Sequence, residues 1–228
     1  MTEISQLIKN LRNITGAGFL DCKSALIANQ NNIDKAVEYL RKKGLSKVQK
    51  KSLREAKEGV VTINISNDIA TIIEINTETD FAAKNSEFIE FVKKLNLIGA
   101  QVKKLEDFYE LRDANNETVK DMLANIISKI GENVVIKKFE ILNSNKDSKI
   151  YGYVHNKYDD NIGKIASLLK IQSTSFDNDL NEIAKNICMH IAASKPIAVS
   201  IDDLDYNLVK KEKEILLANI KSTGKPDN

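Results

Sequence analysis

Residues 59–76 read GVVTINISNDIATIIEIN, and this stretch decides the fold class. Isoleucine and valine alternate with polar residues on both sides of Asn67-Asp68, which is the pattern of two half-buried strands joined by a tight turn. The spacing of the apolar residues then changes to that of an amphipathic helix. The face of this helix carries Phe88, Phe91, Val92, Leu95 and Ile98. A β-hairpin followed by a helix predicts an α+β fold, with helices packed on an antiparallel sheet.

A second hairpin and helix follow in the same order. Residues 148–154 and 162–171 have strand character and flank a turn at 158–161. The helix after them carries its apolar residues on one predicted face, formed by Leu180, Ile183, Ile187 and Ile191. We therefore predict a core of two related subdomains, with antiparallel sheets and packed helices.

Three short helices are expected before the first hairpin. Apolar residues recur with helical spacing over residues 4–14, and the glycine at position 16 predicts the end of this helix. A second helix begins at Phe19, and Asn32 is placed to cap a third. Basic residues followed by Gly44 predict the end of the third helix. The sequence thus predicts a compact three-helix module at the N-terminus.

A basic segment, residues 41–57, joins this module to the core. It has eight basic residues and one acid, Glu55, and little apolar surface, which favours a solvated, partly helical linker. A strip that binds phosphate is the alternative. Aromatic residues that would stack on bases are not interleaved with the basic ones.

These patterns divide the chain into three parts. The N-terminal helical domain and its basic linker take residues 1–54. The first core subdomain takes residues 55–142, where a further helix over 119–130 and a strand follow the first hairpin and helix. The second core subdomain takes residues 143–228.

The composition argues against several classes of protein. The chain has 228 residues, of which 42% are hydrophobic and 29% are charged, and its net charge is only +2. Such a balance argues against a dedicated nucleic-acid or membrane binder, and no apolar run approaches the roughly 18 residues that span a bilayer. The N-terminus lacks the features of a signal peptide, and two cysteines are too few for a disulfide scaffold. We expect a cytoplasmic protein that makes no direct contact with nucleic acid.

Residues suited to enzymatic chemistry are scarce. His155 and His190 are the only histidines, and Cys188 lies two residues from His190, so the two point to different faces of a predicted helix. A zinc site needs about four convergent ligands, so no metal is expected there. Phosphate-loop, dinucleotide and nucleophile-elbow motifs are absent. The sequence therefore predicts no catalytic residue, no metal and no cofactor.

Residues 77–85, TETDFAAKN, carry the most information about function. One interpretation makes them a strand-to-helix turn, with Asp80 as the helix cap and Phe81 turned into the core. The other interpretation makes Phe81 an apolar wedge that projects from the connection, beside an acidic residue. The pattern alone leaves both open.

Several short blocks stand in a fixed order along the chain. They are Leu11-Arg12, Thr15-Gly16-Ala17-Gly18, Asp21-Cys22-Lys23, Leu40-Arg41-Lys42-Lys43-Gly44, Glu78-Thr79-Asp80-Phe81, Ala83-Lys84-Asn85, Ile130-Gly131-Glu132-Asn133 and Met189-His190-Ile191-Ala192-Ala193-Ser194-Lys195-Pro196. In this order the sequence resembles the bacterial elongation factor Ts family, the nucleotide exchange factors of elongation factor Tu. The resemblance implies an N-terminal ubiquitin-associated-like helical domain followed by a two-part α+β core.

The resemblance also implies functional residues. The family's exchange motif, which displaces magnesium from the nucleotide site of elongation factor Tu, falls on Asp80, Phe81, Ala82 and Ala83. Ala82 stands where the family usually has valine, which trims the apolar wedge but leaves its aromatic tip. The residues implied to contact elongation factor Tu elsewhere are Arg12, Phe19, Leu20, Lys23 and His155. Methionines are common in the family at the positions of Phe19 and Leu20.

The resemblance implies a guanine-nucleotide exchange factor that binds elongation factor Tu and promotes GDP release without covalent catalysis, so it is not an enzyme. The alternative is a ubiquitin-associated-like adaptor for nascent chains or RNA, with which the three-helix start and the basic linker are compatible. Longer family members continue from a stretch like residues 222–226 into a coiled-coil hairpin. The sequence leaves three questions open. They are whether the protein forms homo-oligomers, whether its end at Asn228 is natural or truncated, and whether its origin is bacterial or a processed organellar form.

Overall fold

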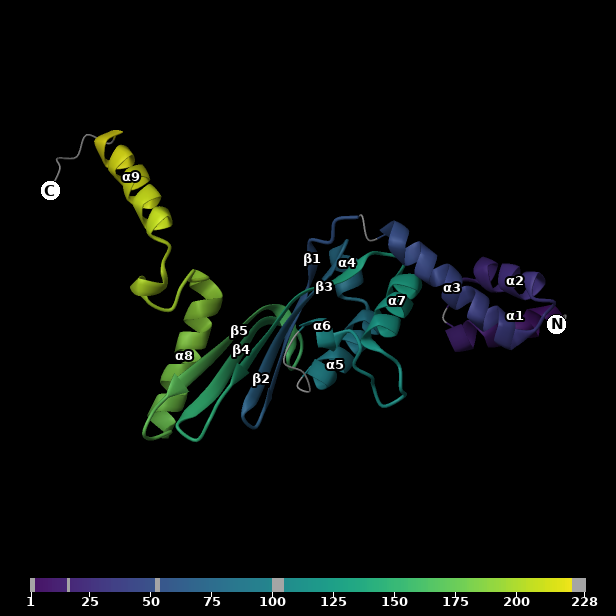
Figure 1. The fold of residues 1–228 in the computed structure, drawn as a ribbon, viewed down its shortest axis with the longest axis horizontal. Helices are drawn as coiled ribbons and strands as arrows, with labels where there is room; N and C mark the ends of the chain where they lie inside the picture. Colours follow the sequence, from purple (N-terminus) through teal and green to yellow (C-terminus); the bar gives the residue numbers. More distant parts are fainter. Residues whose placement is uncertain (1–2, 16, 52–53, 100–104, 223–228) are drawn as a thin grey trace. The chain divides into compact units, whose positions relative to one another are not determined.

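The structure is a computed structural model that describes residues 3–15, 17–51, 54–99 and 105–222. The chain divides into two compact units, Met1–Ala192 and Ala193–Asn228. The first unit starts with three helices and continues into a sheet with helices packed on it (Figure 1). The mixed α+β class predicted from the sequence is confirmed.

Three helices form the N-terminal part of the first unit. They are α1 (Glu3–Thr15), α2 (Phe19–Ala28) and α3 (Ile33–Lys51). Their buried apolar side chains form one small core, made of Ile8, Leu11, Cys22, Ala25, Leu26 and Ala36. Asn32 caps α3 as predicted, because its Oδ1 accepts a hydrogen bond from the backbone N–H of Lys35 at 2.9 Å. Ile14, which we expected on the buried stripe of α1, is 62% exposed.

The third helix is longer than the sequence predicted. We expected it to end at Gly44, but α3 continues to Lys51. A glycine inside a helix costs only about 1 kcal/mol relative to alanine, and good helix formers such as Leu45 and Lys47 follow it here. The first part of the basic segment is therefore helix. Gly16, where we expected the first helix to end, lies outside the described residues.

One antiparallel sheet of five strands forms the centre of the first unit (Figure 1). Its strands are β1 (Glu58–Ser66), β2 (Ile69–Thr77), β3 (Val134–Asn143), β4 (Ser148–Asp159) and β5 (Ile162–Gln172), in the spatial order β3-β2-β1-β5-β4. Both predicted hairpins are present. The sequence pattern did not indicate that they share one sheet, in which β1 meets β5 through only two residue pairs, Val61 with Gly163 and Thr62 with Ile162.

Helices cover the part of the sheet built from β1, β2 and β3. They are α5 (Ser86–Gly99), the short α6 (Leu105–Phe108) and α7 (Val119–Ile130). All five residues predicted for the inner face of α5 are buried. The buried Asn96 ties α5 to β1, since its Nδ2 donates hydrogen bonds to Thr62 Oγ1 at 2.6 Å and to the carbonyl of Ile63 at 2.7 Å.

The helix after the second hairpin turns a different face to the sheet than we predicted. In α8 (Asn178–Ser194) the buried residues are Ala184, Cys188 and Ala192, whereas Ile183 and Ile187 are exposed. The backbone of α8 approaches β5 closely, because Ser167 Oγ donates a hydrogen bond to the carbonyl of Cys188 at 2.8 Å. Only small side chains fit between a helix and a strand at this separation, so the larger isoleucines lie outside.

The second unit contains the short 3₁₀ helix η1 (Ile201–Asp203) and the long helix α9 (Tyr206–Ser222). Among its described residues no side chain is buried. The exposed apolar residues of α9 include Ile215, Leu216, Leu217 and Ile220. In the part of the chain that the structure describes, no helix has the length and apolar character needed to cross a membrane.

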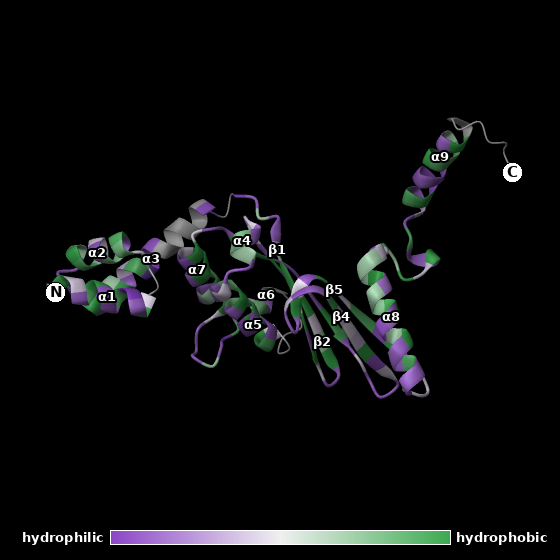
Figure 2. Ribbon diagram, turned by 180° about the vertical axis from the view of Figure 1, so that it is seen from behind, coloured by the Kyte–Doolittle hydropathy of each residue, from purple (hydrophilic) through white to green (hydrophobic). Residues whose placement is uncertain are grey.

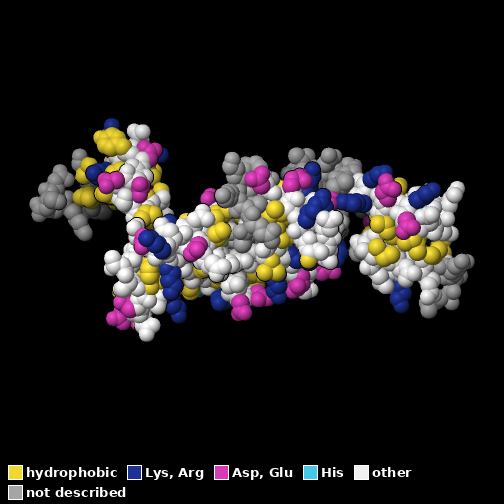
Figure 3. All heavy atoms as spheres, turned by 60° about the horizontal axis from the view of Figure 1, so that its bottom comes forward, with side chains coloured by type: hydrophobic (Ala, Val, Ile, Leu, Met, Phe, Trp, Pro, Cys, Tyr) yellow, Lys and Arg dark blue, Asp and Glu magenta, His cyan; other side chains and the backbone are white. Residues whose placement is uncertain are grey.

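Hydrophobic residues are concentrated in the helices and strands, and the turns at the ends of the hairpins are hydrophilic (Figure 2). On the face drawn in Figure 3, side chains of Lys and Arg are interspersed with those of Asp and Glu. This mixture agrees with the nearly balanced charge of the sequence.

Candidate functional site

The segment that carries Phe81 is a single turn of helix between β2 and α5. This helix, α4 (Asp80–Ala83), is capped by Thr79, whose side-chain oxygen accepts a hydrogen bond from the backbone N–H of Ala82 at 3.3 Å. The interpretation that made Asp80 the cap is therefore wrong. Asp80 is instead the first residue of the helix, where a negative charge is favourable.

Phe81 projects into solvent. Its side chain is 82% exposed, whereas Ala82 is 5% exposed and Ala83 is fully buried in the main core. The interpretation that turned Phe81 into the core is contradicted. The two alanines hold the turn against the molecule, so that of residues 80–83 only Asp80 and Phe81 expose their side chains to solvent.

Asp80 carries its charge beside the exposed ring. Its Oδ2 accepts a hydrogen bond from Lys84 Nζ at 2.9 Å. This hydrogen bond holds the pKa of the Asp80 carboxyl below its usual value. At neutral pH the exposed tip of the segment therefore combines an aromatic ring with an ionised carboxylate.

The turn is held by a second turn that follows α7. Glu132 accepts two hydrogen bonds from Thr79, one from its backbone N–H at 2.9 Å and one from its Oγ1 at 2.7 Å. The second turn also donates to the first, because Glu78 Oε1 accepts a hydrogen bond from the backbone N–H of Asn133 at 2.6 Å. Two of the sequence blocks that carry the family resemblance are thus joined in space. Neither helical nor strand spacing along the chain indicates this pairing.

Gly131 directs the chain from α7 into this second turn. Its φ of 85° lies in the left-handed region, and its N–H donates to the carbonyl of Ile127 at 3.0 Å. A glycine adopts this conformation without the strain that a side chain would add. The predicted end of α7 at Gly131 is confirmed, and it places Glu132 directly after the helix.

The other residues implied to contact a partner lie elsewhere. Arg12 is exposed on α1, and Lys23 is exposed on α2. Phe19 and Leu20 open α2 and are 51% and 75% exposed. Ile14 and Ile27 also expose apolar surface on these helices, which the helical spacing did not predict.

His155 lies on β4, in the second hairpin. Its side chain is exposed, and its Nδ1 is 3.0 Å from the hydroxyl of Tyr153, two residues earlier on the same strand. The structure therefore places the implied contact residues on three separate elements or groups of elements: the N-terminal helices, α4 and β4. A partner that used all of them would need a broad surface.

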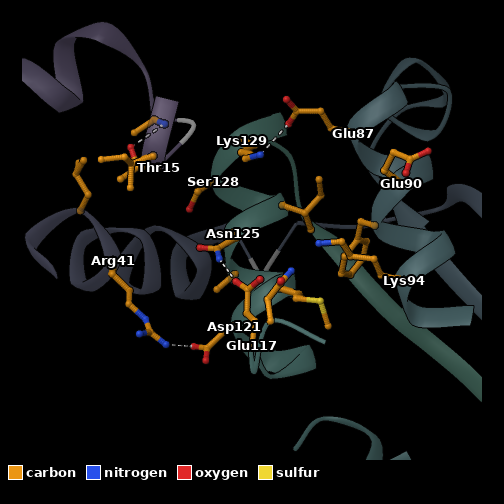
Figure 4. Close-up of a pocket in the computed structure, with 18 of the residues that line it drawn as sticks. Thr15, Arg41, Glu87, Glu90, Lys94, Glu117, Asp121, Asn125, Ser128 and Lys129 are labelled. Carbon is orange, nitrogen blue, oxygen red and sulfur yellow. Dashed lines mark hydrogen bonds and ion pairs between the residues drawn. The ribbon is translucent and has the colours of Figure 1, made fainter. Parts of the chain in front are cut away.

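A cavity of about 800 Å³ lies between the N-terminal helices and the helices α5 and α7 (Figure 4). Its lining includes two ion pairs, Arg41 with Asp121 at 2.6 Å and Lys129 with Glu87 at 3.6 Å. Apolar side chains, among them Val37, Leu40 and Phe91, line it as well. None of the residues implied to contact a partner lies in this lining.

We expect no stoichiometric metal at Cys188 and His190. Cys188 is buried and its burial raises the pKa of the thiol, whereas His190 is exposed two residues further along α8. Within the described residues no group of three or more His, Cys, Asp or Glu side chains could hold a metal ion. Elemental analysis of the purified protein checks this. One zinc per chain that disappears in Cys188→Ser would contradict it.

Comparisons with known proteins agree with one another. A family model described as elongation factor TS matches residues 78–228. A protein named elongation factor Ts from Ehrlichia ruminantium (strain Welgevonden) is 38% identical over 221 residues, which cover 96% of this chain and 76% of the relative. Proteins of the same name from Rickettsia bellii (strain OSU 85-389) and Rhizobium meliloti (strain 1021) are 36% and 35% identical, over 97% and 100% of this chain and 72% and 75% of their own lengths.

Proposed function

This chain belongs to the elongation factor Ts family, and from that premise we propose that it acts on elongation factor Tu as a guanine-nucleotide exchange factor. It binds the GDP-bound form, promotes release of GDP by displacing magnesium, and so allows GTP to load. Its place of action is the cytoplasm, where proteins are synthesised. The observation that carries the proposal is the 82% exposed ring of Phe81, on a turn that hydrogen bonds at Glu78 and Thr79 join to the turn after α7.

The mechanism follows from linkage between two binding equilibria. A factor that binds the nucleotide-free form of its partner more tightly must weaken nucleotide binding by the same factor. Bound nucleotide and magnesium keep the phosphate loop and switch segments of a GTPase ordered. An apolar ring and a carboxylate that enter this region favour the nucleotide-free form. No covalent bond forms or breaks, so the protein needs no catalytic nucleophile, acid or base.

The remaining contact residues supply affinity in this proposal. Phe19 and Leu20 expose apolar surface at the start of α2, with Arg12 and Lys23 on the same helical module. His155 offers a contact from the second hairpin. Burial of such side chains is favourable by roughly 25 cal/mol per Å² of apolar surface. Separate contacts of this kind hold the factor on its partner while the exchange segment, residues 80–83, displaces the magnesium.

A nucleotide-release assay tests the proposed function. Fluorescent GDP is loaded on a bacterial elongation factor Tu, unlabelled GDP is added in excess, and the fall of fluorescence is followed with increasing concentrations of this protein. We expect the release rate to rise with concentration and then saturate. An unchanged rate, together with salt-sensitive binding of RNA, would favour the adaptor function instead.

A further inference from the structure

The cap of α4 depends on a residue that lies 53 positions away in the sequence. Thr79 Oγ1 donates its hydrogen to Glu132 Oε1 at 2.7 Å. A hydroxyl has one hydrogen and two lone pairs, so this donation leaves a lone pair for the backbone N–H of Ala82, which lies 3.3 Å away. Glu132 thus orients the hydroxyl that caps the helix turn carrying Phe81.

A second link fixes the turn after α7 itself. Asn133 is only 2% exposed, and its Nδ2 donates to the carbonyl of Arg54 at 2.8 Å. The backbone N–H of Asn133 donates to Glu78, which also lies 3.6 Å from the guanidinium of Arg54. Glu132 therefore projects from a backbone that is anchored independently of Thr79.

We propose that Glu132 is a positioning residue for exchange: its carboxylate accepts hydrogen bonds from the backbone N–H and the hydroxyl of Thr79, and so holds the α4 turn in the one conformation that presents Phe81. This inference rests on the proposed function. Phe81 is too exposed to be fixed by packing of its own ring, so its position follows the backbone of α4. Without Glu132 the turn samples more conformations, and ordering it again opposes formation of the nucleotide-free complex.

The first arm of the test is structural and needs no partner. In Glu132→Ala, hydrogen exchange at the amides of Thr79 and Ala82 should become faster, because both lose the arrangement that protects them. Glu140→Ala is the matched control, since it removes the same charge from an exposed position on β3. Its amide exchange at these two residues should equal that of the unaltered protein. Unchanged protection in Glu132→Ala would overturn the inference.

The second arm is a double-mutant cycle in the GDP-release assay at saturating factor. Hydrogen bonds to charged groups are strong, so Glu132→Ala should lower the maximal release rate by about tenfold. In the Phe81→Ala background the same change should have little further effect, because the residue acts through the ring. Glu140→Ala should release GDP at the normal rate.

Additive effects of Glu132→Ala and Phe81→Ala, or a normal rate in Glu132→Ala, would overturn the positioning role. If Glu132→Ala fails to fold, Glu132→Gln replaces it in both arms. Its amide oxygen keeps the bond from Thr79 Oγ1 and its NH₂ cannot accept from Thr79 N, so an intermediate effect is expected. Should the unaltered protein fail to accelerate GDP release, the proposed function is wrong, and the first arm still decides whether Glu132 fixes the turn.

Discussion

Replacing Phe81 with alanine is expected to slow GDP release from elongation factor Tu by about ten- to a hundred-fold at a fixed concentration of the factor. Burial of a phenylalanine in a partner is worth roughly 1.5 to 3 kcal/mol, and the effect on release is largest if that energy is realised mainly in the nucleotide-free complex. The fold should be unaffected, because the ring is 82% exposed and packs on nothing in the core. Stopped-flow fluorescence and thermal melting measure the two expectations together.

Phe88→Ala is the matched control for this prediction. The same substitution, seven residues later, removes a fully buried ring from the main core. It should lower the free energy of unfolding by about 3 to 5 kcal/mol while leaving exchange per folded molecule close to normal. If Phe81→Ala instead melts much lower and exchanges normally per folded molecule, Phe81 is a structural residue and the exchange segment has been misassigned. Asp80→Ala should slow release in the same direction as Phe81→Ala.

Deleting residues 1–50 is expected to weaken binding to elongation factor Tu by about a hundredfold. The deletion removes Phe19 and Leu20, which are exposed and which we propose to be buried against the partner. The maximal release rate at saturating factor should change little, because the exchange segment stays in place. Titration of the release rate against factor concentration separates the two quantities.

The truncated protein should remain folded, since the two buried cores share no residue. The deletion breaks the ion pair between Arg41 and Asp121, in which Arg41 is 61% exposed, and such exposed pairs contribute at most about 1 kcal/mol. The double substitution of Phe19 and Leu20 by alanine in the full chain provides the comparison without truncation. A truncated core that binds as tightly as the full chain would show that the module is not a binding element.

Much of this architecture could be predicted because it depends on local spacing. The alternation around Asn67-Asp68 specified the first hairpin, and the helical spacing from Phe88 to Ile98 specified the buried face of α5. Both follow from one side of a regular element meeting the core. The resemblance to a family likewise rested on short blocks of neighbouring residues.

The errors arose where tertiary contacts outweighed local spacing. The isoleucines of α8 suggested an inner face, but close approach at Ser167 and Cys188 turned the small residues inward instead. The sequence around Phe81 could not decide its exposure, because the exposure depends on which side of the α4 turn packs on the rest of the molecule, and that side carries Ala82 and Ala83. The contact of Glu132 with Thr79 could not be predicted either, because the two residues lie 53 positions apart in different blocks of the sequence.

The narrow junction between β1 and β5 has a consequence for how the protein folds. The hairpin of β1 and β2 closes around a two-residue turn, whereas Val61 meets Gly163 only after roughly 100 residues have been brought back. Pairing over such a distance is slow, and two residue pairs contribute little free energy to folding until the neighbouring core forms. During synthesis, we therefore expect the first hairpin and α5 to emerge and collapse before β5 is available. Ile162 of β5 is the last residue of the buried main core to be synthesised, so this core is complete only once β5 has been made.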